Sequence, residues 1–515
     1  MFSRIHSAVC SGVEGKVVNV ESDISRGLPG INIVGLASTL VMESRERIRS
    51  AIINSGMEYP HGRITVNLTP ASLHKNGSCL DLPIAVGILT SSLLIDMAGI
   101  EEWGIIGELA LDGRILRIDG VLPILLGLKN SGIRKAIIPD GNIEEAILVN
   151  GIDIYPVRDL RDCVELLTLS ARDPDRLIPL DTDLCPEYTA LREPDEELPD
   201  FADIHGQENA KRAIMIAVTG RHGLLMIGSP GCGKTMLAER IPAVMPPMTG
   251  EEMLETAAVY SAAGKEYKYF SNSFRRPFRH PHHTIGKAGL LGGGLIPVPG
   301  EITLSHNGVL FLDEVCEFDR SLIEALRLPL EERSIVHFRR GQAYRFPCDF
   351  QLVMAANPCP CGYFGDSDHI CRCTEAQLAS YRKKLSGPIM DRIDLRISMD
   401  KVSYSELSRK DESRNLSSAD IRKSVAKGIS FARQSGRKGF NALLTDRETD
   451  VYCRLGNEES SLMNSAYASL GMSPRSYRKT LKVARTIADL DGSEEIKCSH
   501  LSEALSYRIQ EVINE

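Results

Sequence analysis

The sequence predicts an α/β protein with a helical C-terminal part, and three observations support this fold class. Runs typical of buried strands alternate with helical stretches over most of the first 400 residues. A glycine-rich loop, Gly228 to Thr235, follows the apolar run Leu224 to Ile227, as in a doubly wound nucleotide-binding domain. Beyond Asp400 the strand pattern fades and helical periodicity takes over. We therefore expect two α/β domains followed by a helical bundle.

Composition sets the broad class of the protein. A chain of 515 residues is too long for one hydrophobic core, and 43% hydrophobic with 25% charged residues is ordinary for a globular protein. The formal net charge is -8, so any contact with nucleic acid requires a local basic patch. No apolar secretory core follows Met1 to His6, and we expect a cytoplasmic protein without a membrane span. The thirteen cysteines then favour thiols or metal ligands over disulfides.

Composition shifts divide the chain into four parts. Residues 1–170 read as an α/β domain, with strands expected at 16–20 and 64–68 and helices at 43–54 and 82–97. Residues 171–200 contain five prolines and many acids, which indicates a linker. Residues 201–400 form the nucleotide-binding domain, and 401–515 the helical bundle. Within that bundle we expect helices at 418–433, 448–455, 458–470, 474–489 and 500–513.

The first domain resembles the proteolytic domain of Lon-type proteases, through residues 107–116 (GELALDGRIL) and 132–139 (GIRKAIIP). The resemblance implies a shared fold. Those proteases activate a serine with a lysine, because a hydroxyl needs a neighbouring base to become a nucleophile. Here the corresponding segment, residues 119–125, contains no lysine, and the serine-bearing segment carries Ser78 and Cys79. We therefore expect no peptidase activity.

The loop Gly228 to Thr235 fits the spacing G-x-x-x-x-G-K-[ST] of a phosphate-binding loop. Its glycines let backbone N–H groups face phosphate oxygens, Lys234 reaches the β and γ phosphates, and the Thr235 hydroxyl ligates Mg²⁺. The simpler alternative is an ordinary turn from a strand into a helix. The predicted nucleotide-binding residues are Gly228, Ser229, Pro230, Gly231, Cys232, Gly233, Lys234, Thr235 and Met236.

Two later apolar runs end in polar residues suited to hydrolysis. Residues 308–312 lead into Asp313 and Glu314, which resemble a Walker B pair: Asp313 would hold Mg²⁺ and Glu314 would act as general base for water. Residues 350–356 lead into Asn357, whose amide would contact the γ-phosphate or the water, as at a sensor 1 position.

With the segment 203–207 (DIHGQ) and a helix expected from Asp319 through Leu330, these motifs resemble the AAA+ ATPases. The pattern is similar to the magnesium-chelatase-like group, and within it to the ComM/YifB family, over essentially the whole chain. The resemblance implies ATP and Mg²⁺ as cofactors and an arginine finger acting from a neighbouring subunit, hence a ring, expected to be a hexamer. It implies these catalytic residues: Lys234, Asp313, Glu314, Asn357, Arg392 as the finger, and Arg475 as sensor 2, with Arg478 or Arg485 as alternatives for that last role.

Two basic features are not required for nucleotide hydrolysis. Residues 271–300 contain no acid, and residues 335–346 have the pattern of a hairpin turning at Arg340-Gly341-Gln342. In helicases of the minichromosome maintenance type, which this group resembles, such an insertion and hairpin reach into the ring pore and hold DNA. Solvated loops are the alternative, and for His280 to His283 a metal site is a less favoured one. The predicted DNA-binding residues are Arg275, Arg276, Arg279, His282, His283, Lys287, Arg339 and Arg340.

Four cysteines, Cys359, Cys361, Cys371 and Cys373, form two C-x-C pairs separated by nine residues. Four thiolates so spaced can close a tetrahedral Zn²⁺ site and hold together a loop that is too small to pack by itself. Free thiols or a redox pair are the alternatives.

These features favour a ring-forming, Mg²⁺-dependent ATPase that moves on single-stranded or branched DNA. The family resemblance implies helicase or branch-migration work in recombination during natural transformation. A chelatase-type motor subunit and a protein-remodelling ATPase remain the alternatives. The former leaves the basic elements without an obvious use, and the latter is expected to carry an aromatic and hydrophobic pore loop.

Overall fold

The structure, a computed structural model, describes residues 2–35, 39–73, 75, 77–95, 98–181, 199–265, 275–366, 368–384, 387–402 and 415–509. Most of the linker expected at 171–200 lies outside these ranges, as do residues 271–274 of the basic insertion. Within the described ranges, every helix is too short or too polar to cross a membrane.

The N-terminal part is built on a seven-stranded mixed sheet in the order β3-β4-β2-β1-β5-β8-β9. Its strands are β1 (Phe2–Ser11), β2 (Glu14–Ser25), β3 (Gly30–Val34), β4 (Arg63–Thr69), β5 (Trp103–Ile105), β8 (Lys135–Pro139) and β9 (Asp153–Val157). Residues of β2 and β4 alternate between buried and more exposed, because one face of the sheet packs on the core. The expected strands 16–20 and 64–68 lie inside β2 and β4.

Helices pack on this sheet, and α2 is buried along its whole length. The predicted helix 82–97 is shorter than expected, because α2 ends at Ser91 and Leu93 takes a positive φ of 67°. The other N-terminal elements are α1 (Thr39–Asn54), α2 (Asp81–Ser91), α3 (Val121–Asn130), α4 (Ile143–Ala146), α5 (Leu160–Arg172) and the short pair β6 (Glu108–Leu109) and β7 (Ile115–Leu116).

The central part contains a five-stranded parallel sheet in the order β11-β12-β15-β10-β16. Its strands are β10 (Leu224–Gly228), β11 (Phe278–Arg279), β12 (Val309–Leu312), β15 (Gln351–Ala356) and β16 (Leu395–Met399). Because β15 lies between β10 and β12, the loops after all three strands meet at one edge of the sheet. The sequence order of the motifs does not show this adjacency.

Helices and one hairpin complete the central part. They are α6 (Glu208–Gly220), α7 (Lys234–Val244), α8 (Gly250–Ala262), α10 (Lys287–Leu291), α11 (Glu301–Leu304), α12 (Arg320–Ala325), α13 (Arg327–Glu332), α14 (Glu375–Lys384), α15 (Gly387–Met390), and the strands β13 (Ser334–Arg339) and β14 (Gln342–Pro347). The single helix expected from Asp319 to Leu330 is two helices, α12 and α13. The hairpin turns as expected: Arg339 pairs with Gln342, and Arg340 and Gly341 have φ of 50° and 77°, as a two-residue type I′ turn requires.

The C-terminal part is helical, as the periodicity predicted. Its helices are α17 (Ser418–Gln434), α18 (Asp446–Tyr452), α19 (Asn457–Ser469), α20 (Pro474–Leu490) and α21 (Cys498–Ile509). Ser417 and Thr445 begin α17 and α18 with capping boxes. Helices α17 and α20 share one hydrophobic core with α6 and β10, so the bundle packs directly on the nucleotide-binding sheet.

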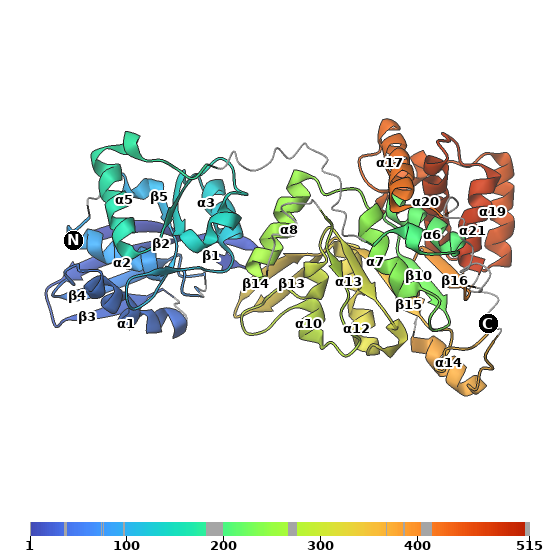
Figure 1. The fold of residues 1–515 in the computed structure, drawn as a ribbon, viewed down its shortest axis with the longest axis horizontal. Coiled ribbons are helices and arrows are strands. Elements are labelled where there is room, and N and C mark those ends of the chain that lie inside the picture. The colour runs from blue at the N-terminus through green and yellow to red at the C-terminus, as the bar shows by residue number, and fades with distance from the viewer. Residues whose placement is uncertain are drawn as a thin grey trace.

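Figure 1 shows α8 reaching from the central part toward the N-terminal sheet. Met253, Ala257 and Tyr260 of α8 belong to the same buried cluster as the core of the N-terminal sheet. Polar contacts add to this joint: Ser261 Oγ donates to Glu145 Oε2 over 2.7 Å, and the backbone N–H of Gly120 donates to the Ser261 carbonyl over 3.0 Å. The N-terminal part is therefore fixed to the ATPase part through a shared apolar interface.

Candidate active site

The phosphate loop joins β10 to α7 with the backbone geometry that its sequence requires. Gly231 and Gly233 have φ of 80° and 93°, which side-chain-bearing residues rarely adopt. Lys234 Nζ donates to the carbonyls of Gly228 over 2.7 Å and Ser229 over 3.1 Å, and to Asn357 Oδ1 over 3.2 Å. The lysine and the predicted sensor amide, which are 123 residues apart in the chain, therefore meet at the carboxyl edge of the sheet.

The predicted magnesium ligands also meet there. Thr235 Oγ1 donates a hydrogen bond of 2.6 Å to Asp313 Oδ2, and Asp313 Oδ1 accepts one of 2.9 Å from the backbone N–H of Glu314. A hydroxyl and a carboxylate in contact are the hard oxygen donors that Mg²⁺ prefers when it is also bound to phosphates and water. The residues present thus fit Mg²⁺ held by Thr235 and Asp313.

Glu314 has a φ of 49°, and its side chain is 54% exposed. His283 lies beside it, with Nδ1 at 3.9 Å from Glu314 Oε2. His283 comes from the basic insertion, and its ring lies against that of His282 with centroids 4.1 Å apart. The structure therefore brings a residue predicted to bind DNA beside the predicted general base.

Arg392 and Arg475 lie together near the amino ends of the parallel strands, opposite the phosphate loop. Asp394 and Leu395 both donate their backbone N–H to the Gly223 carbonyl, which immediately precedes β10. Arg392 lies two residues before Asp394 and therefore near the amino end of β10. The phosphate loop begins at Gly228, at the carboxyl end of the same strand. Five residues of strand span about 13 Å. Arg392 thus faces away from the nucleotide site of its own chain.

Both arginines contact one carboxylate. Arg392 pairs with Glu331 Oε1, and Arg475 Nη2 lies 3.4 Å from the same oxygen. The alternatives for sensor 2 lie elsewhere: Arg485 is buried against Asp489, and Arg478 pairs with Asp446 and Asp450. Of the three, Arg475 is the arginine that the fold places beside Arg392.

A cavity of about 520 Å³ opens at these strand ends, between the sheet and α20. Its cationic lining comes from both the sheet side and the helical bundle. The cations are Arg221, Arg333, Arg392, Arg475, Arg478, Lys479 and Lys482, against the carboxylates Glu331, Asp349, Asp394 and Asp446. The excess of cations suits an anionic group presented from outside the chain.

The basic insertion presents fewer cations than its sequence indicated. Arg275 and Arg276 are buried, and Arg276 Nη2 pairs with Glu252 over 2.9 Å. Arg279 pairs with Glu301 over 2.6 Å. The carboxylates that neutralise Arg276 and Arg279 lie outside the acid-free segment, Glu301 directly after it and Glu252 on α8, so the composition of the segment does not show the pairing. Lys287 and His282 do remain exposed.

The hairpin tip, by contrast, is exposed. Phe338 is 71% exposed, and Arg339 and Arg340 are exposed beside it. Arg339 Nε donates to the Gly294 carbonyl over 3.2 Å, which ties the tip to the glycine-rich loop of the insertion. Leu295 in that loop is 73% exposed. Phe338 and Leu295 were not among the predicted DNA-binding residues, although Phe338 directly precedes Arg339 in β13.

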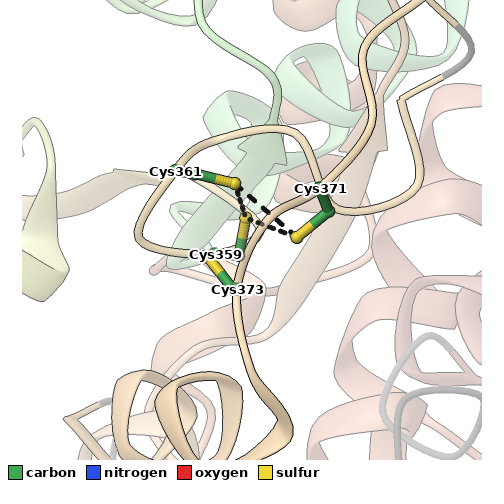
Figure 2. A group of neighbouring side chains, drawn as sticks. All are labelled: Cys359, Cys361, Cys371 and Cys373. Carbon is green, nitrogen blue, oxygen red and sulfur yellow. Dashed lines mark hydrogen bonds between the residues drawn. The ribbon is translucent and has the colours of Figure 1, made fainter.

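The four cysteines converge, as Figure 2 shows. All four Sγ atoms lie within 4.8 Å of one another, and the closest pairs are 3.3, 3.6 and 3.7 Å apart. A tetrahedron of sulfurs around Zn²⁺ at 2.3 Å has edges of about 3.8 Å. Backbone N–H groups of Arg372 and Tyr363 lower the pKa of the Cys361 thiol to about 6, whereas desolvation and the neighbouring thiols raise the pKa values of Cys371 and Cys373. The donor set and its spacing fit zinc.

The N-terminal serine and cysteine are not arranged for nucleophilic chemistry. Ser78 donates its hydroxyl hydrogen bond to Glu108. Cys79 is buried, and that burial raises the pKa of its thiol to about 12. A thiol held protonated at neutral pH is a poor nucleophile.

Comparison with known proteins adds the family. Residues 200–407 match the family described as magnesium chelatase, subunit ChlI, and residues 20–142 and 415–508 match its N-terminal and C-terminal companions, described as subunit ChlI of Mg-chelatase and subunit ChlI C-terminal. Competence protein ComM of Haemophilus influenzae is 41% identical over 504 residues, covering 98% of this chain and 97% of that protein. The uncharacterized protein YifB of Escherichia coli is 41% identical over 508 residues, with the same coverage of both chains.

A shorter match agrees with the Lon-like fold expected for the first domain. A Lon protease of Mycolicibacterium smegmatis is 23% identical over 165 residues, 30% of this chain and 21% of that protein. The full-length matches and the predicted fold class agree with the geometry of the phosphate loop, the Asp313 site and the helical bundle. The chain belongs to the magnesium-chelatase-like family of AAA+ ATPases, together with ComM and YifB.

Proposed function

We propose that this protein is a ring-forming ATPase that uses hydrolysis to move on DNA, as a branch-migration helicase during recombination in natural transformation. The observation that carries the proposal is the exposed hairpin tip, Phe338 to Arg340, next to the glycine-rich loop. Nucleotide hydrolysis needs neither element, and a chain with a net charge of -8 needs a local basic patch to hold a polyanion.

Hydrolysis takes place at a boundary between two copies of the chain. One copy supplies Lys234, Thr235 and Asp313 for the phosphates and Mg²⁺, with Glu314 to polarise the attacking water. The bound Mg²⁺ neutralises charge on the phosphates. Arg392 and Arg475 of the next copy stabilise charge that develops on the transferred phosphoryl group. Their position at the far edge of their own sheet supports this division, and six copies close the ring.

DNA occupies the ring pore and meets the hairpin tips. Arg339 and Arg340 contact phosphates, so binding weakens as salt rises. Lys287 and His282 add to this contact from the exposed part of the insertion. Single-stranded or branched DNA is the proposed substrate, and the name of the relative ComM, a competence protein, supports a role in the uptake and recombination of DNA.

Zinc is the proposed structural cofactor, bound by Cys359, Cys361, Cys371 and Cys373. Their sulfur spacing supports a closed four-thiolate site, which needs no water ligand and takes no part in hydrolysis.

One observation favours a second function. Leu295, Ile296 and Phe338 are exposed apolar residues around the same tip, as a polypeptide-gripping loop would have. A protein-remodelling ATPase is therefore the alternative, whereas a chelatase-type subunit gains no support from this surface.

The test is the ATPase rate with and without single-stranded, duplex and forked DNA. The double variant Arg339→Ala/Arg340→Ala is compared with Arg433→Ala, an arginine in the last turn of α17. We expect stimulation by DNA in the wild type and in Arg433→Ala, and its loss in the double variant. DNA-independent hydrolysis together with no salt-dependent binding would discard the DNA proposal, and stimulation by an unfolded polypeptide instead would establish the alternative.

A further inference from the structure

The cysteine loop lies directly on the phosphate loop. Gly362, between the two cysteine pairs, has a φ of 85°, and a Cβ added there would lie 2.7 Å from Cγ and Cδ of Pro230. The turn that brings it there is closed by the Gly362 N–H, which donates to the Cys359 carbonyl over 3.0 Å. The contact therefore begins at a predicted metal ligand and ends on a residue of the phosphate loop.

Asp366 makes a second contact from the same loop. Its side chain is only 2% exposed and accepts from Lys401 Nζ at 2.9 Å and from the backbone N–H groups of Asp368 and His369 at 2.9 and 3.0 Å. The Ser229 side chain lies close enough to this carboxylate to be, after Lys401, one of the groups that lower its pKa. Mainly the Lys401 contact, with help from these donors, keeps the pKa of Asp366 well below its usual range, so it is ionised at neutral pH.

Ser229 connects these contacts to Lys234, the predicted phosphate-binding lysine. The Ser229 carbonyl accepts from Lys234 Nζ over 3.1 Å, while the Ser229 side chain lies beside Asp366. A shift of Asp366 or Gly362 would thus move the backbone that positions Lys234. The segment 362–370 that carries both residues has its two ends fixed by the cysteine pairs.

We propose that the metal bound by the four cysteines clamps the phosphate loop, so that nucleotide affinity depends on occupancy of the cysteine site. The ion has the chemistry of a thiophilic tetrahedral cation, Zn²⁺. Four thiolates hold the residues on either side of Gly362 and Asp366 together, which keeps Gly362 on Pro230 and Asp366 beside Ser229. The inference rests on the proposed nucleotide site but requires neither DNA nor hydrolysis.

The test measures zinc content by metal analysis and the affinity for Mg²⁺-ADP by calorimetry, on the full chain without DNA. Asp366→Asn keeps all four thiolates, so we expect it to retain zinc and bind ADP about tenfold more weakly, as losing hydrogen bonds to a charged group implies. Cys371→Ser should lose zinc and show at least the same loss of ADP affinity. Asp368→Asn, in the same loop, and Cys498→Ser, a cysteine outside the cluster, should match the wild type in both measurements.

The wild type alone provides the second measurement, which no misfolded variant can obscure. Coupling between two ligands is reciprocal, so saturating Mg²⁺-ADP should raise the affinity for zinc, measured by competition with a chelator, by the same factor by which zinc raises the affinity for ADP. Equal zinc affinity with and without ADP overturns the inference, as does a wild-type ADP affinity in zinc-free protein or in Asp366→Asn. Absence of any ADP binding would overturn the ATPase proposal and the inference together, whereas absence of DNA binding would overturn only the DNA proposal.

Discussion

Arg475 approaches Glu331 to 3.4 Å, at the same carboxylate oxygen that Arg392 contacts. The two arginines come from α20 and from the turn before β16, which are 83 residues apart in sequence. A carboxylate that holds both fork-shaped cations keeps them grouped in the lining of the same cavity.

The first prediction concerns this pair. Arg392→Ala and Arg475→Ala should each lower the ATPase rate at least a hundredfold and leave ADP affinity within about twofold, because in the proposed ring the arginines meet a neighbour's nucleotide and stabilise charge in the transition state. Arg433→Ala, which removes an exposed arginine in the last turn of α17, serves as the control and should keep its rate.

Mixing experiments show whether the arginines act between subunits. Subunits carrying Arg392→Ala, mixed with subunits carrying Glu314→Gln, form some boundaries with an intact loop on one side and an intact arginine on the other. Partial recovery of hydrolysis is expected from the mixture. If two inactive preparations stay inactive at every mixing ratio, the arginines do not act across a subunit boundary.

A second prediction follows from the 3.9 Å approach of His283 to Glu314. His283 belongs to the insertion that we propose binds DNA, so a DNA phosphate is expected to compete with Glu314 for its ring N–H and to release the proposed general base. His283→Ala should therefore raise the DNA-free ATPase rate and reduce the ratio of DNA-stimulated to basal rate. His61→Ala, which removes an exposed histidine of the N-terminal part, is the control. An unchanged stimulation ratio in His283→Ala would contradict this coupling.

A third prediction separates the roles at the hairpin tip. An exposed aromatic ring stacks on an unpaired base, worth about 1 to 3 kcal/mol, and carries no charge. Phe338→Ala should thus weaken binding of single-stranded DNA about tenfold without changing its dependence on salt. Arg339→Ala should reduce the slope of log affinity against log salt by about one. Fluorescence anisotropy at several salt concentrations measures both, and equal loss for duplex and single strand in Phe338→Ala would speak against stacking.

A fourth prediction concerns pH. Asp81 is buried beside Arg47 at 2.9 Å, and burial, opposed by Arg47, raises the pKa of its carboxyl from 3.8 to about 7. Between these values the folded state holds a proton that the unfolded chain lacks. Raising the pH through this window therefore lowers the free energy of unfolding, by up to about 1.4 kcal/mol per pH unit from this group.

Denaturant unfolding between pH 5 and pH 8 measures this contribution. In Asp81→Asn the side chain does not ionise, so the fall in stability across the window should become shallower than in the wild type. Glu101→Gln, which changes an exposed acid between α2 and β5, should leave the wild-type slope intact. A slope that Asp81→Asn does not change would show that Asp81 is already ionised in the folded protein at pH 5.

The sequence by itself determined the fold class, the phosphate loop and the helical C-terminal part. These features depend on residues close together in the sequence. They are the spacing of apolar residues, the glycines with positive φ at Gly231 and Gly233, and capping residues such as Ser417. The hairpin turn at Arg340-Gly341 was predictable for the same reason, since the turn type depends on two residues.

Only the tertiary structure decided which distant residues meet. The strand order places Asn357 beside Lys234. Arg392 lies at the opposite ends of the same strands, away from the phosphate loop of its own chain. Neutralisation of Arg276 by Glu252 and the seating of the cysteine loop on Pro230 likewise depend on packing between segments far apart in sequence. Composition and spacing show which side chains a segment has. Which residues those side chains contact depends on the three-dimensional arrangement of the sheet and the helices around it.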